Sequence, residues 1–110
     1  EAVKVKHSNA EFDTGEEYID GRKIYGRTFK VASDITTIGN TVIATLDTGL
    51  EPVGFHNYYL TRWMLYALTV STSVYIWVYY DSATGEVVAQ VAGTGYKVGA
   101  GTSIPIKYVK

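Results

Sequence analysis

The sequence predicts an all-β protein, a single antiparallel β-sandwich of jelly-roll-like type with about seven to nine short strands. Short runs rich in β-branched and aromatic residues recur along its 110 residues, and such residues favour strands. Eleven Gly against only two Pro supply tight turns between these runs. An Asp-Gly pair lies between alternating apolar residues near the start of the chain, which is a strong signal for a β-hairpin.

The Asp20-Gly21 pair predicts a hairpin that spans residues 17–31. We expect a type I′ turn at this pair, because Gly adopts a positive φ without a Cβ clash. Beyond the turn, alternation places Tyr25 and Phe29 on one face of the strand, which we expect to be the inner face.

Residues 1–16 are expected to be a lead-in or linker from an upstream stalk, and residues 17–110 to form the β-sandwich domain. The lead-in carries three local signals: alternation over 2–6, the spacing of a capping box at Ser8 and Glu11, and turn composition over 13–15. We therefore expect a short strand followed by a turn or a single helical turn in this part.

After the hairpin, β-branched and aromatic runs alternate with turn signals. Strands are expected over 41–46, 74–80, 86–91, 96–98 and 102–109. Between them we expect a break at 32–34 and a loop over 50–56. Turns are expected at 39–40, 47–49, 71–73 and 81–85. The strand over 74–80 is apolar or aromatic on both faces, so it is either central or meets a partner subunit. Because Pro105 cannot donate to a sheet, the last strand is expected at an edge or with Pro105 facing outward at its start.

Residues 57–70 fit two periodicities. Tyr59, Trp63, Tyr66 and Val70 have the spacing of one helix face, whereas strict alternation over the same residues fits a strand. The β-rich composition of the surrounding chain favours the strand.

Composition argues against several classes of function. Ten Lys and Arg against eleven Asp and Glu give a net charge of −1, which lacks the basic footprint of a nucleic-acid-binding protein. No apolar run approaches the ~20 residues of a membrane helix, so membrane insertion is not expected. The absence of Cys removes disulfides, thiolate catalysis and Cys-based zinc sites.

An enzyme is not expected either. The two histidines, His7 and His56, lack a metal-ligand spacing, so no metal site is expected. The Gly-rich stretch over 93–101 lacks the Lys-Ser/Thr of a phosphate-binding loop, so no cofactor is expected. The carboxylates gather near turns, where they usually serve solubility or local hydrogen bonds rather than glycoside hydrolysis.

Three segments resemble phage structural proteins. The segment Tyr18-Ile-Asp-Gly-Arg-Lys-Ile-Tyr25, with Ser8 and Glu11 before it and Arg-Thr-Phe over 27–29, resembles the opening of the C-terminal tip domain of phage tail-fibre, receptor-binding and head-fibre proteins. Residues 41–50 resemble the second strand of these domains, and residues 104–110 resemble their closing strand. The chain departs from that pattern at Tyr18, Lys23 and 47–48, and residues 52–101 do not match in detail.

This resemblance implies a homotrimeric β-sandwich at the tip of a virion fibre, on a tail or a capsid. Such a domain would act outside the cell, would follow an upstream fibre or virion protein, and would adsorb to a bacterial surface, often through a polysaccharide. Two alternatives remain open: a carbohydrate-binding module of a secreted bacterial protein, or a purely structural capsid-fibre or decoration domain.

Saccharide binding requires aromatic faces with a few polar groups beside them. The residues 56–58 are favoured because loops on a rigid scaffold carry binding, whereas Trp63 and Trp77 lie in apolar strands and suit a core or subunit interface as well. The candidate glycan-binding residues are His56, Asn57, Tyr58, Tyr59, Arg62, Trp63, Trp77, Tyr79, Tyr80 and Asp81.

Overall fold

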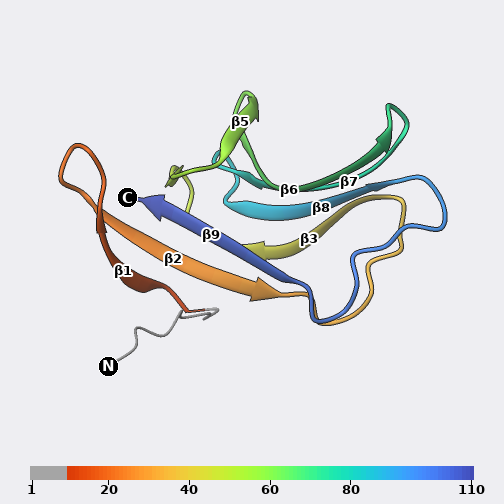
Figure 1. The fold of residues 1–110 in the computed structure, drawn as a ribbon, viewed down its shortest axis with the longest axis horizontal. Coiled ribbons are helices and arrows are strands. Elements are labelled where there is room, and N and C mark those ends of the chain that lie inside the picture. Colours follow the sequence, from red (N-terminus) through yellow and green to blue (C-terminus); the bar gives the residue numbers. More distant parts are fainter. Residues whose placement is uncertain (1–9) are drawn as a thin grey trace.

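The structure, a computed structural model, describes residues 10–110, and these residues form two antiparallel sheets packed face to face (Figure 1). The described part of the chain contains no helix. The predicted all-β sandwich is therefore confirmed, and the helical alternative for 57–70 is wrong. The strands are β1 (Phe12–Glu17), β2 (Lys23–Lys30), β3 (Gly39–Thr45), β4 (Glu51–Pro52), β5 (His56–Tyr59), β6 (Arg62–Ser71), β7 (Val74–Asp81), β8 (Glu86–Ala92) and β9 (Ser103–Val109).

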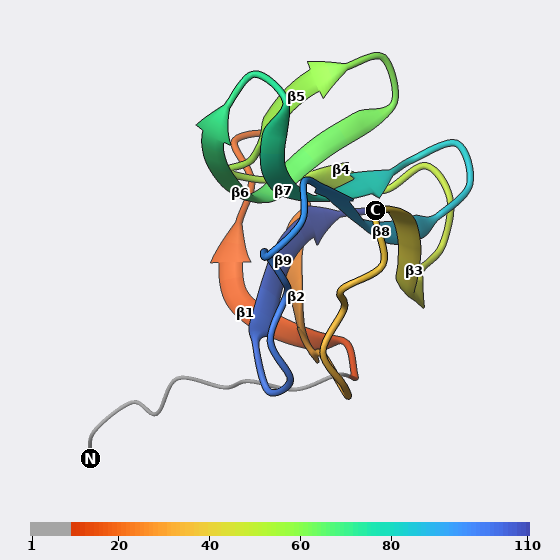
Figure 2. The ribbon, with the colours of Figure 1, turned by 90° about the vertical axis from the view of Figure 1, so that its right-hand side faces the viewer.

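One sheet has four strands in the order β1-β2-β9-β4, and the other has five in the order β3-β8-β7-β6-β5. Figure 2 shows β1, β2 and β9 grouped on one side of the molecule and β5, β6 and β7 on the other. In the five-stranded sheet, β5 to β8 follow one another as consecutive hairpins, which places β7 in the middle. The central position expected for 74–80 is thus the one observed.

The core lies between the two sheets and is built by strict alternation along the middle strands. On β7, Ile76, Val78 and Tyr80 face inward, and each is almost completely buried. Their partners from the other strands are Val87, Ala89 and Val91 on β8 and Ile104, Ile106 and Tyr108 on β9. Burying each large side chain of this kind contributes about 1.5–3 kcal/mol, so these strands hold the sandwich together.

The β1–β2 hairpin is present, but its turn type differs from the expectation. The Gly21 N–H donates to the Tyr18 carbonyl at 2.9 Å, and the Tyr18 N–H donates to the Arg22 carbonyl at 2.8 Å. Gly21 has a φ of 85°, whereas Asp20 is not among the residues with positive φ. These features define a type I turn followed by a Gly bulge, not a type I′ turn. The Asp20 carboxylate accepts the Arg22 N–H at 3.1 Å and stabilises this turn.

Strand β1 begins earlier than the sequence suggested. The turn expected over 13–15 is wrong: these residues lie in β1, and a change of register there accommodates Gly15. Phe12 and Asp13, expected in the lead-in, therefore pair with Gly26 and Tyr25 of β2. The Phe12 ring covers Gly26 on β2 so closely that a Cβ at Gly26 would lie 2.9 Å from the Phe12 Cζ. The expectations for 2–6, His7 and Ser8 fall outside the described residues.

Three other local expectations are corrected. Residues 39–40 begin β3 rather than forming a turn, residues 96–98 contribute only a single bridge between Val98 and Ile35, and the loop over 50–56 contains β4.

Strand β9 lies between β2 and β4, but β4 reaches only Tyr108 and Val109. The expected edge position therefore applies only to the Pro105 end of β9, where Pro105 is exposed.

Two loops dock against each other at one end of the five-stranded sheet. The Leu46 N–H donates to the Gly85 carbonyl at 2.7 Å, and the Gly49 N–H donates to the Ser82 carbonyl at 2.8 Å. A Cβ on Gly85 would overlap the Leu46 carbonyl oxygen. Gly85 also has a positive φ of 77°, so this docking needs a residue without a side chain.

We expect Gly85→Ala to lower the free energy of unfolding by about 3 kcal/mol or more, because it adds a steric overlap to a left-handed backbone conformation. Gly95→Ala is the matched control: its φ is 84°, but no heavy atom lies within 4 Å of its Cβ position. The control should lose only about 1 kcal/mol. Urea denaturation measures both, and equal losses would contradict the proposed close packing of the two loops.

Candidate functional site

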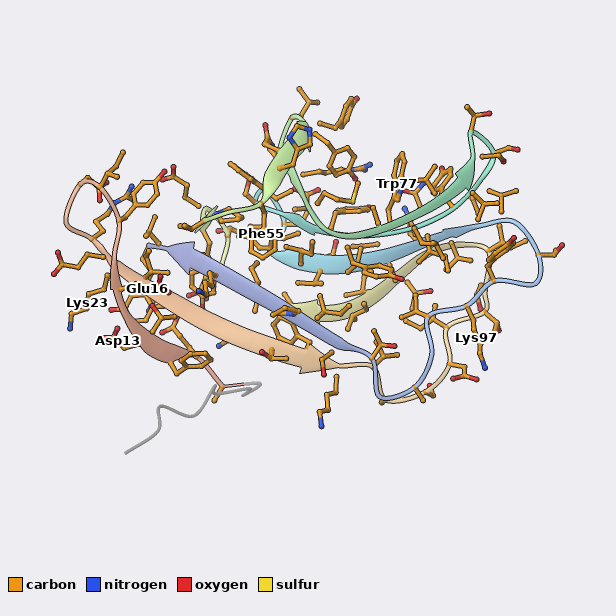
Figure 3. All side chains as sticks on the ribbon, viewed as in Figure 1. Asp13, Glu16, Lys23, Phe55, Trp77 and Lys97 are labelled. Atoms are coloured by element: carbon orange, nitrogen blue, oxygen red, sulfur yellow. The ribbon has the colours of Figure 1, made fainter. Side chains whose placement is uncertain are left out.

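The alternation that sends Ile76 and Val78 of β7 into the core sends Tyr75, Trp77 and Tyr79 to the opposite face of the sheet. Figure 3 shows Trp77 pointing away from the four-stranded sheet. Three aromatic rings therefore follow one another along the outer face of the central strand.

A fourth ring, Tyr58 of β5, contacts this row from the side. Tyr75 and Trp77 are stacked, with centroids 4.2 Å apart and an interplanar angle of 27°. Tyr58 stands edge-on to Trp77 at 5.8 Å and to Tyr79 at 6.2 Å. Stacked and edge-to-face pairs are the two favourable arrangements of aromatic rings, so the row is fixed in position rather than free to rotate.

Polar groups from both neighbouring strands fix the row further. From β6, the Thr69 hydroxyl accepts the Trp77 indole N–H at 3.3 Å. From β8, the Gln90 amide donates to the Tyr75 hydroxyl at 3.2 Å. Trp77 is paired across the sheet with Ala67 on β6 and with Gln90 on β8, so one flank of the indole is small and the other polar.

Arg62, the first residue of β6, lies over the end of the row. Its guanidinium carbon is 4.7 Å from the centroid of the Tyr79 ring and 5.6 Å from that of the Tyr59 ring. Arg62 forms no ion pair with a carboxylate within residues 10–110. The Tyr58 hydroxyl is buried and makes no hydrogen bond of good geometry. Burial raises the pKa of Tyr58, and the positive charge of Arg62 opposes this rise.

Together these residues line an open groove of about 450 Å³, which we call the aromatic groove; its lining residues are Tyr58, Tyr59, Arg62, Trp77 and Gln90. Its volume lies within the range of small-ligand sites, and it combines ring faces with a few polar groups. No carboxylate lines it. It can therefore hold a ligand that presents an apolar face and several hydrogen-bonding groups.

Of the candidate residues, Tyr58, Tyr59, Arg62 and Trp77 line the aromatic groove. Tyr79 does not line it: its side chain is buried against Tyr58 and Arg62 and supports them. Two further candidates support the loops beside it instead of lining it. The Asn57 amide donates to the carbonyls of Leu60 and Arg62, both at 2.9 Å. The Asp81 carboxylate accepts the Thr61 hydroxyl at 2.7 Å and the Ala83 N–H at 2.9 Å.

Three candidates lie elsewhere. Tyr80 is fully buried in the core, where its hydroxyl donates to the Asp47 carbonyl at 2.7 Å and accepts the Leu50 N–H at 3.3 Å, so its assignment to a surface site is corrected. Trp63 packs against the core, because it is paired with the inward-facing Tyr80. His56 is exposed on β5 and does not line the groove.

Sequence reasoning missed Tyr75, Gln90 and Thr69. Tyr75 shares the alternation of Trp77 and Tyr79, so the pattern within β7 contains the signal for it. Gln90 and Thr69 come from neighbouring strands, and only the strand register places them beside the rings.

A second hollow of about 350 Å³ lies between two loops and is lined by Thr36, Ile38, Thr94, Gly95, Tyr96 and Lys97. It offers a single aromatic ring. Its only cation, Lys97, is already paired with Asp34 at 2.8 Å (Lys97 is labelled in Figure 3). The aromatic groove is therefore the better candidate site.

Among residues 10–110, no group of three or more His, Cys, Asp or Glu side chains is placed to hold a metal ion. The same part of the chain includes no helix long and apolar enough to span a bilayer.

Comparison of the chain with protein-family models, with curated proteins and with solved structures finds no match in any of the three. The function is therefore inferred from the chain's own residues and their geometry.

Proposed function

We propose that this protein is a non-enzymatic binding domain that holds a saccharide in the aromatic groove. The observation that supports it most directly is the Trp77 indole, which lines an open groove while Tyr75 stacks against it and Thr69 binds its N–H. A fixed ring of this kind can pack against the C–H face of a sugar. Gln90 and Arg62 line the same groove and can bind sugar hydroxyls.

The biological setting that we propose is the tip of a phage fibre, on a tail or a capsid, which adsorbs to a polysaccharide of the bacterial surface. The support for this setting is the resemblance of the β1–β2 hairpin segment and of the closing strand to phage fibre-tip domains. A carbohydrate-binding module of a secreted bacterial protein is the alternative that the aromatic groove supports equally. A purely structural domain would not require a ligand-binding groove.

The proposed homotrimer needs a surface other than β7, because one face of β7 is core and the other carries the aromatic row. Strand β6 offers one. Tyr66, Leu68 and Val70 alternate along it and are 42%, 41% and 55% exposed. We refer to these three residues as the β6 stripe.

The backbone beside the β6 stripe is also open. Strand β5 pairs with β6 only at Arg62, Trp63 and Met64, so residues 65–71 have no paired strand on that side within residues 10–110. No charged residue occurs from Trp63 to Tyr80, although edge strands are normally protected by charge or Pro. We propose that the β6 stripes of three copies meet at the threefold axis of the homotrimer, where uncharged residues can pack together without repulsion.

We expect Trp77→Ala to weaken saccharide binding about tenfold or more, because the stacking surface is lost. A glycan array would identify a bound saccharide, and calorimetry would compare the variants on it. Tyr96→Ala, in the second hollow, is the control and should bind as the wild type does. If no surface polysaccharide binds, or if Trp77→Ala binds unchanged while its melting temperature is retained, the proposed function is wrong.

For self-association, we expect light scattering to give an oligomer mass for the wild type at micromolar concentration and a monomer mass for Leu68→Lys, because a buried Lys at an apolar interface is unpaired. Ile19→Lys is the matched control, since Ile19 is 97% exposed at the tip of the β1–β2 hairpin and should not change the mass. A monomeric wild type would exclude the proposed role of the β6 stripe.

A further inference from the structure

The cation of the aromatic groove, Arg62, forms no ion pair within the described chain. Arg22, Lys23, Lys97, Lys107 and Lys110 each pair with a carboxylate on the surface. Arg62 instead lies against two aromatic rings, and no acidic residue lines the groove that it borders.

The acidic residue nearest to Arg62 by strand pairing is Asp81, and its carboxylate is already engaged. Arg62 and Asp81 are register partners of β6 and β7. One oxygen of Asp81, however, accepts both the Thr61 hydroxyl and the Ala83 N–H, and no ion pair joins Asp81 to Arg62. The guanidinium therefore keeps its donors for a ligand, while the rings of Tyr59 and Tyr79 fix its position.

A second donor beside Arg62 is also unused. Tyr58 lines the same groove, and its hydroxyl is buried beside Arg62 without a hydrogen bond of good geometry. A ligand oxygen that reaches this hydroxyl would recover the cost of leaving it unpaired. A guanidinium and a phenol hydroxyl side by side form a donor set that matches an anionic oxygen pair.

We infer that the saccharide bound in the aromatic groove is acidic, with a carboxylate that binds Arg62 and the Tyr58 hydroxyl while the sugar ring packs on Trp77. This inference rests on the proposed function. A carboxylate is favoured over a phosphate monoester because Arg62, the only cation that lines the groove, matches a single negative charge. The ligand class is therefore a uronic-acid-containing polysaccharide.

The test compares acidic ligands with their neutral methyl esters, which differ in the charge and one methyl group of each carboxylate. Oligomers of galacturonate, glucuronate and mannuronate are titrated calorimetrically beside the same oligomers with methyl-esterified carboxylates. For the wild type we expect at least one acid form to bind about tenfold more tightly than its ester, because the ester cannot form the charged pair. Salt should weaken the acid form and leave the ester unchanged.

The variants assign this difference to the two residues. Arg62→Gln should bind acid and ester equally, Arg62→Lys should keep part of the preference, and Tyr58→Phe should reduce it while the rings stay in place. Lys30→Gln is the control, since Lys30 is an exposed cation on β2 in the other sheet. An unchanged acid-to-ester ratio in a folded Arg62→Gln variant would overturn the inference.

The remaining outcomes separate this inference from the proposed function. Binding of neutral dextran or of the esters alone, abolished by Trp77→Ala, would keep the saccharide site and reject the acidic ligand. Tighter Arg62-dependent binding of dextran sulfate or of a glycerol-phosphate polymer would reject the carboxylate in favour of another anion. Binding of none of these probes would reject both proposals.

Discussion

The alternation of side chains along β7 is the constraint on which both the core and the aromatic groove depend. Ile76, Val78 and Tyr80 fix the strand against the four-stranded sheet, and the same backbone then has to present Tyr75 and Trp77 outward. A shift of register by one residue would move the rings into the core and the core residues into water. The outward direction of these rings is therefore determined by the packing of the core behind them.

Strand β7 is held by backbone pairing on both sides and by side-chain hydrogen bonds at one end. The strand is paired along most of its length with β6 and β8, and the Tyr80 hydroxyl binds the 46–50 turn through Asp47 and Leu50. This placement explains why a tyrosine that looked suited to a ligand serves the fold instead. Its neighbour Tyr79, one residue away, faces the opposite side and lies beneath Arg62.

Local signals in the sequence were sufficient for the fold class and for most strands, because alternation and turn composition are properties of neighbouring residues. They were insufficient where a contact between residues distant in the sequence determines the local conformation. The Gly21 turn takes the bulged form rather than type I′, Gly15 is absorbed into a strand, and Gly26 is explained only by the Phe12 ring across the sheet. At the candidate site, Trp77 and Arg62 were identifiable by residue type, whereas Gln90 and Thr69 needed the register of three strands.

The turn between β5 and β6 gives the groove a property that its lining residues do not reveal. Leu60 holds a left-handed φ of 43°, and Asn57 secures this conformation through the carbonyls of Leu60 and Arg62. The backbone of Arg62 is thus immobilised when the chain folds, before any ligand arrives. Because the guanidinium also lies against the Tyr59 and Tyr79 rings, part of the conformational entropy of ordering it is lost in folding rather than in association.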